Sequence, residues 1–592
     1  MAESLLASDS LNSGEPGGKS SSSSSGGGAG GSARITPALA VCALLGSAGA
    51  AQYGLAVGVV NAPQAAIKAD LALTTLQISL VVSAFAVAGW AGATIAPRFV
   101  DSWGRRPFLI ALQCEWPPDA NACAVLRCAA LRCAAPRRAA SRRALLTCPS
   151  PTSGRPPTPA SAGIFVLGGG LCAAVAFLKD AAPQRALSFG LLMVARCCFG
   201  VGAGAASVAV PMYLGEIAPA ALKGAFGALN QFSLVVLILV GQFMSLGMSG
   251  SALWPWLFAS QGVLAAAVIL ASGPLLLESP RWLVAQGRAD EAKAVLLRCR
   301  GYGEAEAEAE VDEILAGGGA AAKDGAAGAG DKPPLMTTWQ LLASPALRAP
   351  LLVAVMLQLT QQFSGINAVF FYSTSFFEAA VADPGAASGA APSAQSALVA
   401  TWGTIATGAI NVLATAASIP LIERAGRKPL LLWACGGMLA CALCLTGVLV
   451  VKDAAPAFAK LFGSLSIVFV LIYVCFFEVG LGAIPWSIGG ELFPEDSRAT
   501  AMGFAAGANW LGTTIVGVAF PYLQELLGNY SFVPFAVWLA GGLAFTVFYV
   551  PETKGRSPAE LLSWFAAQKG GGADKRAIDY SLIKSAAEDE EN

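Results

Sequence analysis

Six side-chain amides lie within long apolar stretches of this sequence, where polar groups are costly. They are Gln231, Gln361, Gln362, Asn367, Asn411 and Asn509. An amide that is removed from water has to be hydrogen-bonded, and each amide offers both donors and an acceptor. Neighbouring hydroxyl groups of a sugar need the same combination of hydrogen-bond donors and acceptors. The six residues therefore predict a site for a neutral polyhydroxylated ligand, although such amides can also serve only to hold helices together.

The residues around these amides refine the expected site. Gln362 and Asn367 would lie roughly 140° apart on one continuous helix. They are therefore expected to bracket a ligand rather than lie on the same face of the helix. Trp486 offers a flat apolar face for the C–H side of a sugar ring. Within the apolar stretches the notable charges are Arg196 and Glu478, which favours a neutral ligand. Arg196 could line a pathway or be a helix-end residue bonded to its neighbours, and the sequence leaves both open.

The apolar stretches themselves are expected to be membrane spans. Hydrophobic residues make up 55% of the 592 residues and charged residues only 12%, which is too few charges for the surface of a water-soluble fold. A span needs roughly 20 apolar residues. Twelve stretches qualify: 38–60, 77–97, 162–179, 187–211, 226–248, 254–276, 349–372, 398–421, 429–451, 463–486, 500–523 and 531–550. The predicted fold class is an all-α membrane protein with twelve transmembrane helices in two six-helix halves.

The polar segments divide the chain into five parts. They are a disordered cytosolic tail (1–37), a first six-helix half (38–280), a cytosolic linker (281–347), a second half (348–550) and a second cytosolic tail (551–592). Lys and Arg gather in the loops on one side of the predicted spans, so that side and both tails are expected to be cytosolic. Within the linker, residues 304–315 have the pattern of a short charged helix.

Charged loop motifs repeat in the two halves. Segment 101–107 resembles 423–429, and Glu216 stands in the same relation to Lys223 as Glu491 does to Arg498. Repeated six-helix units build one large transporter fold. The acids and bases of these loops are expected to form a clamp that closes the cytosolic side: Arg105, Arg106, Glu216, Lys223, Glu423, Arg427, Lys428, Glu491 and Arg498. Membrane topology alone would explain the basic residues but not the acids paired with them.

One segment of the first half has no counterpart in the second. Residues 114–161 are rich in Arg, Pro, Ser and Cys and interrupt the expected third span. Arginines in such number are incompatible with a bilayer core. Two interpretations stay open, namely an untranslated segment read through by a gene model and a genuine cytosolic loop insertion.

A series of short segments, taken in order, resembles facilitative glucose transporters of the sugar porter family in the major facilitator superfamily. They are 52–54, 58–64, 211–216, 229–231, 278–281, 358–367, 476–480, 484–486 and 551–556. The resemblance extends over about 38–565, apart from 114–161 and the middle of the linker. It implies the major facilitator fold and a sugar site lined by Gln231, Gln361, Gln362, Asn367, Asn411, Glu478, Trp486 and Asn509. It also favours Arg196 as a pathway residue.

The expected function is uniport of glucose or a similar hexose by alternating access. Proton-coupled relatives carry an aspartate in the first span where this chain has Ala56, and the chain contains no histidine. Proton-coupled hexose symport stays an alternative, with Glu478 or Glu216 as proton carrier. A sugar sensor that does not transport is a second alternative, which the short tails disfavour. No nucleophile–base set or phosphate loop indicates an enzyme.

No cofactor or metal is expected, because histidine, the commonest metal ligand, is missing. The expected partners are a small neutral sugar and the lipid bilayer, and the zero net charge indicates no nucleic-acid partner. The oligomeric state is not predicted. The plasma membrane is the first expectation for localisation, with the vacuolar and plastid envelope membranes as alternatives.

Overall fold

The computed structural model describes residues 35–113, 163–219, 222–318, 336–381 and 393–569. Within these ranges the chain consists of helices and their connections and contains no strand. Residues 114–161 and the outer parts of both predicted tails lie outside the described residues.

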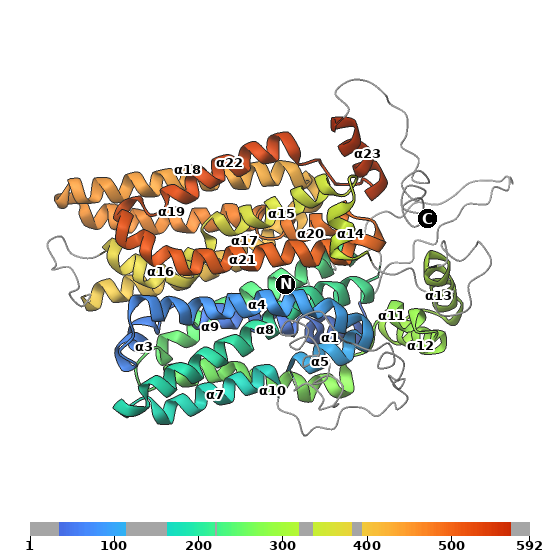
Figure 1. The fold of residues 1–592 in the computed structure, drawn as a ribbon, viewed down its shortest axis with the longest axis horizontal. Coiled ribbons are helices and arrows are strands. Elements are labelled where there is room, and N and C mark those ends of the chain that lie inside the picture. The colour runs from blue at the N-terminus through green and yellow to red at the C-terminus, as the bar shows by residue number, and fades with distance from the viewer. Residues whose placement is uncertain (1–34, 114–162, 220–221, 319–335, 382–392, 570–592) are drawn as a thin grey trace, which may run out of the picture. The chain divides into compact units, whose positions relative to one another are not determined.

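The first half is built from nine helices among the described residues. They are α1 (Pro37–Gly46), α2 (Ala48–Gly58), α3 (Gln64–Asp70), α4 (Thr75–Trp103), α5 (Arg105–Gln113), α7 (Ile164–Leu178), α8 (Arg185–Ile217), α9 (Lys223–Met248) and α10 (Trp254–Leu275). The second half comprises α15 (Arg348–Phe363), α16 (Ile366–Val381), α17 (Ala394–Ala425), α18 (Arg427–Ala454), α19 (Ala459–Val479), α20 (Ile484–Leu492), α21 (Glu495–Leu527) and α22 (Val533–Tyr549). In Figure 1 the blue and green helices lie together, beside the yellow to red ones.

The lengths and composition of these helices agree with a membrane protein. In the described part of the chain, nine helical segments are long and apolar enough to cross a bilayer, and α1 and α2, bent by 41° at Ser47, make a tenth. The shorter apolar helices α7 and α22 fall on the predicted third and twelfth spans. The predicted all-helical membrane fold is confirmed.

The seventh and tenth spans are each broken into two helices. The seventh breaks between α15 and α16 at Gly365, whose φ of +87° favours glycine. A Cβ at this position would also overlap the ring of Phe535. The tenth breaks between α19 and α20 over residues 480–483. These breaks lie beside the polar residues of the predicted site, so they shape it directly.

Two pairs of long helices make the most extensive contacts between the halves. One pair is α4 with α21, and the other is α9 with α17. Within the first half, α2 approaches α9 so closely that a Cβ on Gly54 would overlap the backbone carbonyl of Leu234. The halves therefore enclose a central region between α2, α9, α15, α17 and α21.

Short helices follow each half at the end of the bundle that carries the charged loops. They are α11 (Pro280–Ala285), α12 (Ala289–Arg300), α13 (Glu304–Gly318), α14 (Thr338–Ala343) and α23 (Pro558–Lys569). Helix α13 coincides with the charged helix predicted at 304–315. Helices α11 to α13 share a small apolar core around Leu283, Leu296 and Val311. Helix α14 packs on α21 instead, and Thr500 donates a hydrogen bond of 2.7 Å to the Met336 carbonyl.

Helices α5 and α7 together have the dimensions of one membrane span. They contain 9 and 15 residues, and each alone is shorter than the roughly 20 residues that a span needs. They contact each other, and both pack against α8 and α10. The equivalent position in the second half is occupied by the single 28-residue helix α18. We therefore propose that α5 and α7 are the two parts of the third span.

Deleting 114–161 is expected to join α5 to α7 and to raise the amount of folded protein in the membrane several-fold. The physical reason is that the join removes polar chain from the middle of a span without removing any described packing contact. Size-exclusion fluorescence of a tagged chain, with and without the segment, measures this. A deletion that abolishes the folded peak would instead identify 114–161 as a genuine insertion.

Candidate functional site

All eight residues of the predicted sugar site line one cavity between the halves. They are Gln231, Gln361, Gln362, Asn367, Asn411, Glu478, Trp486 and Asn509. Gln231 comes from α9, while the other seven come from α15 to α17 and α19 to α21 of the second half. The second half therefore supplies most of the polar lining.

A chain of hydrogen bonds connects the amides of the second half. Gln362 Nε2 donates to Asn509 Oδ1 at 2.9 Å, and Asn367 Nδ2 donates to Gln362 Oε1. Asn509 Nδ2 donates to Gln361 Oε1 at 2.5 Å and to Gln358 Oε1 at 2.6 Å. The prediction that Gln362 and Asn367 lie on separate faces of one helix is wrong, because the break at Gly365 turns the chain and brings the two amides together.

Glu478 is the buried carboxylate of the cavity and connects both halves. It accepts hydrogen bonds from Thr415 Oγ1 at 2.9 Å on α17 and from Gln231 Nε2 at 3.3 Å on α9. Asn411, one turn before Thr415, is fully buried, and neither its amide nitrogen nor its oxygen has a partner among the described residues. Its unsatisfied amide is suited to bind a ligand in the cavity.

Several further residues line this cavity that the sequence analysis did not single out for the site. The polar ones are Tyr53, Ser207 and Asn230, and the apolar ones include Phe370 and Phe477. Both lie in segments that resemble sugar porters, Tyr53 in 52–54 and Asn230 in 229–231. Nothing else in the sequence marked their side chains as members of the site.

Arg196 lies in the middle of α8 and is completely buried, so the helix-end interpretation is wrong. Its guanidinium donates to three backbone carbonyls: Val81 at 3.0 Å, Val82 at 3.2 Å and Ala56 at 3.1 Å. It also lies 4.8 Å from the ring centroid of Phe85. Within the part of the chain that the structure describes, the hydrogen bonds of this arginine thus go to carbonyls of α2 and α4 and not to a carboxylate.

The charged loops of the first half form a compact cluster. Arg105 makes a two-pronged ion pair with Glu216, at 2.9 Å for each nitrogen–oxygen contact. Arg106 donates to the Gly273 carbonyl at 2.7 Å. Glu278 accepts the backbone N–H groups of Arg105 and Arg106 at 3.0 and 3.1 Å and so caps α5. Lys223 is the first residue of α9, and its side chain lies outside the described residues.

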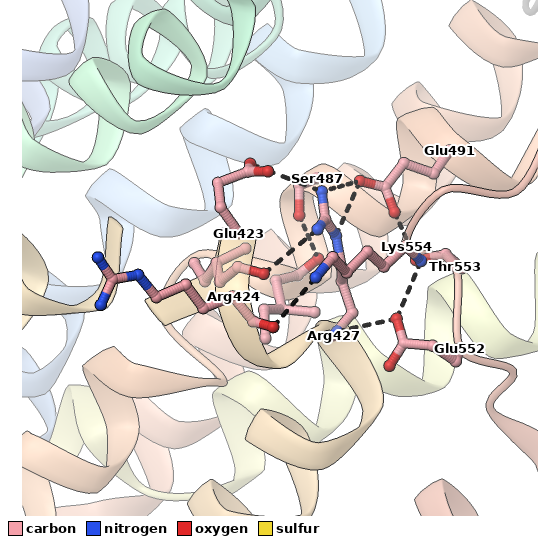
Figure 2. A network of polar contacts seen from close by, with 10 residues as sticks. Glu423, Arg424, Arg427, Ser487, Glu491, Glu552, Thr553 and Lys554 are labelled. Atoms are coloured by element: carbon pink, nitrogen blue, oxygen red, sulfur yellow. Dashed lines mark hydrogen bonds and ion pairs between the residues drawn. The ribbon is translucent and has the colours of Figure 1, made fainter. Parts of the chain in front are cut away.

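The second half repeats this cluster around Arg427 (Figure 2). Arg427 contacts Glu491 at 2.9 Å and Glu423 at 3.9 Å. Glu552 accepts the backbone N–H groups of Arg427 and Lys428, each at 3.0 Å, which is the same cap that Glu278 provides. Lys428 and Arg498 donate to backbone carbonyls of their own half, those of Val547 and Phe493. Glu278 and Glu552 lie in two of the segments that resemble sugar porters, but their capping role was not predicted from the sequence.

The two capping glutamates have different electrostatic surroundings. Burial raises the pKa of Glu278, and the backbone N–H bonds offset it only in part. Burial also acts to raise the pKa of Glu552. The hydrogen bonds from four backbone N–H groups outweigh this effect, so the pKa of that carboxyl is lowered. Every contact given above for the two charged clusters joins helices of one half, so a clamp between the halves stays a prediction for another conformation.

At the opposite end of the bundle, hydrogen bonds join the two halves. Asn61 Nδ2 donates to Ser373 Oγ at 2.6 Å, and Asn61 Oδ1 accepts from the Thr374 backbone N–H at 3.3 Å. Gln64 Nε2 donates to the Phe371 carbonyl at 2.5 Å. Asn61 and the first residue of α3 are thus tied to α16, which joins the two halves at this end.

A partly buried aspartate, Asp70, organises the same end of the first half. Asp70 accepts hydrogen bonds from Ser251 Oγ at 2.7 Å and Trp254 Nε1 at 2.9 Å, and Lys179 Nζ lies 3.3 Å away. Burial acts to raise the pKa of Asp70, but the hydrogen bonds and the Lys179 charge outweigh it, so the pKa lies below its usual range. The stabilisation is therefore present at neutral pH and is lost as the pH falls through this lowered pKa.

Asp70→Asn is expected to lower the melting temperature at neutral pH by about 2–4 °C, since one ion pair and two charge-assisted hydrogen bonds are weakened. It should also remove part of the further loss of stability below about pH 4. Thermal unfolding of purified protein as a function of pH measures both effects. Asp180→Asn is the matched control, because Asp180 contacts the same Lys179 but is 81% exposed. Equal destabilisation by both variants would contradict the assignment.

The chain is similar to known membrane transporters over almost its whole length. The model of the sugar (and other) transporter family matches residues 152–564. Member 3 of the facilitated glucose transporters of solute carrier family 2, from Rattus norvegicus, is 33% identical over 94% of this chain and 99% of its own length. Member 4 from Homo sapiens is 40% identical over 64% of this chain and 70% of its own length.

Solved structures confirm the fold. The proton:xylose symporter XylE bound to 6-bromo-6-deoxy-D-glucose superposes with a TM-score of 0.64 at 22% identity, covering 89% of this chain and 98% of that one. A partially occluded inward-open form of XylE from E. coli has the same TM-score at 21% identity, covering 88% and 100%. These structures belong to the major facilitator superfamily, as the resemblance implied. The chain is a multi-pass integral membrane protein and belongs to the sugar (and other) transporter family.

Proposed function

We propose that the protein carries glucose or a similar hexose by uniport. The observation that supports this most strongly is the cavity of Gln361, Gln362, Asn367 and Asn509, in which linked amides face Trp486. Such a lining presents donors and acceptors for sugar hydroxyl groups together with an apolar surface for the ring. The relatives named as facilitated glucose transporters support the choice of substrate.

Alternating access follows from the different contacts at the two ends of the bundle. The halves are hydrogen-bonded to each other at Asn61 and Gln64, while Arg105 and Arg427 pair within their own halves. This arrangement corresponds to a state that is closed at the Asn61 end. In the opposite state, Arg105, Glu216, Arg427 and Glu491 would exchange partners across the halves. Together such pairs could bias two states that differ by a few kcal/mol.

Uniport rather than proton symport is supported by the surroundings of Arg196. Its guanidinium bonds the carbonyl of Ala56 at 3.1 Å, at the position where proton-coupled relatives carry an aspartate. Glu478 is the remaining carboxylate of the cavity lining, and it is hydrogen-bonded to Thr415 and Gln231. If protons are coupled to transport, Glu478 is the residue in the cavity that would carry them.

Uptake of radiolabelled glucose in yeast that lacks its own hexose transporters tests the proposal. Saturable uptake that stops at equilibrium, and that an uncoupler does not change, is expected. Accumulation above the external concentration that an uncoupler abolishes would replace uniport by symport. Hexose binding without any uptake would favour a sensor. Immunolocalisation tests the plasma membrane, which we propose as the site of action.

A further inference from the structure

The first half contributes four polar residues to the cavity, and two of them have polar atoms without a protein partner. Gln231 is bonded to Glu478, and Ser207 Oγ donates to the Gly204 carbonyl at 2.7 Å and accepts from Trp510 Nε1 at 3.4 Å. By contrast, Asn230 Oδ1 is a buried atom without a hydrogen-bond partner among the described residues, and the hydroxyl of the partly buried Tyr53 is not hydrogen-bonded to any of them. These two polar groups are left for a ligand or for water.

The side chains of both residues are held in place by their helices. The Tyr53 ring packs against Trp510 and Phe85, with ring centroids 5.1 and 5.7 Å away. The next residue, Gly54, brings α2 into backbone contact with α9 at Leu234, one turn after Asn230. Rigid aromatic packing and close helix contact leave little freedom to be lost on binding, so these groups are preorganised.

Polar groups without a hydrogen-bond partner are unusual in the interior of a protein. Almost all buried polar groups in proteins are hydrogen-bonded, and those that are not need a specific explanation. In the second half, Gln361, Gln362 and Asn509 satisfy one another. Tyr53 and Asn230 have no such arrangement, although both line the same cavity. A hydroxylated ligand that reaches across to the first half would provide both groups with hydrogen-bond partners.

We propose that Tyr53 and Asn230 form a second sugar-binding surface, which hydrogen-bonds hydroxyl groups on the side of the sugar that faces α2 and α9. This inference rests on the proposed hexose transport. A sugar bonded only to the second half would bind equally well whether or not the first half approached it. A sugar that also bonds Tyr53 and Asn230 stabilises the closed arrangement of the halves, and so promotes the transition between the two open states.

Inhibition of glucose uptake by a series of monodeoxyglucoses tests this surface. In the wild type, the analogue that lacks the hydroxyl bonded by Tyr53 should bind about five-fold more weakly than glucose, which is the effect of one neutral hydrogen bond. In Tyr53→Phe, this penalty should disappear while the penalties of the other analogues persist. Asn230→Leu, which is similar in volume, should erase the penalty of a different analogue. Exchange of labelled sugar should also slow in both variants.

The matched control is Tyr549→Phe, because Tyr549 is exposed at the end of α22 and lies outside the cavity lining. It should leave the whole analogue profile unchanged. An unchanged profile in both Tyr53→Phe and Asn230→Leu, with normal amounts of each variant in the membrane, would overturn the inference. In that case uptake by the wild type would still support hexose transport. A wild type that takes up no hexose would defeat the proposed function itself.

Discussion

Replacing Gln362 with leucine is expected to lower the efficiency of glucose uptake by about a hundred-fold. The amide of Gln362 bonds both Asn509 and Asn367, and it lines the cavity. Leucine would leave Asn509 Oδ1 and Asn367 Nδ2 without this partner and would remove one ligand contact. A buried group that loses its partner costs about 1–3 kcal/mol, and each 1.4 kcal/mol is a factor of about ten.

Initial uptake rates over a range of glucose concentrations measure this loss, normalised to the amount of transporter in the membrane. Gln358→Leu is the matched control, because Gln358 lies one turn earlier on α15 and bonds Asn509 without lining the cavity. It should lower the melting temperature but change uptake efficiency much less. Equal losses of uptake efficiency in the two variants would show that Gln362 acts only through packing.

Replacing Ala56 with aspartate is expected to make uptake strongly dependent on pH. The Arg196 guanidinium already reaches the backbone of residue 56, so a carboxylate there would lie beside a buried cation. The first span would then carry a protonatable group beside Arg196, and its charge state would alter the contact between α2 and α8. We expect uptake to be about ten-fold faster at about pH 5 than at about pH 8, because protonation of this carboxyl releases its ion pair with Arg196.

The wild type should show a nearly flat profile over the same range, and so should Ala56→Asn, which adds a polar side chain of similar size without a titratable proton. Uptake at a series of pH values, with and without an uncoupler, distinguishes the three proteins. A flat profile for Ala56→Asp would mean that residue 56 and Arg196 do not control coupling. Strong pH dependence of uptake by the wild type would instead indicate that Glu478 carries the proton.

The polar residues of the cavity differ in the hydrogen bonds that they already make. The amides on α15, α16 and α21 are linked to one another, so a sugar has to compete with existing hydrogen bonds there. Asn411, Tyr53 and Asn230 retain unpaired polar atoms among the described residues. A ligand therefore gains new hydrogen bonds mainly at α17, α2 and α9. This difference explains how one small neutral molecule could draw the halves together.

The sequence by itself determined the membrane class, the helical spans and eight residues of the cavity. Long apolar stretches of this kind are stable in a bilayer rather than in water. Each such stretch becomes a helix, because its backbone polar groups have to be hydrogen-bonded within the segment. The polar residues stand out against that background, so Gln231, Asn411 and Glu478 could be named without coordinates. The repeated loop motifs likewise predicted the twofold organisation, including the paired Arg105 and Arg427.

Only the tertiary structure decided which of these groups contact one another. The break at Gly365 brings Gln362 beside Asn367, because one glycine with a positive φ redirects the helix. The charged clusters close within each half, and Glu278 and Glu552 become helix caps, which depends on helices that are distant in sequence. Tyr53 and Asn230 resemble ordinary span residues until packing shows that their polar groups have no partner. Such relations depend on three-dimensional packing, since hydrogen-bond partners across helices leave no period in the chain.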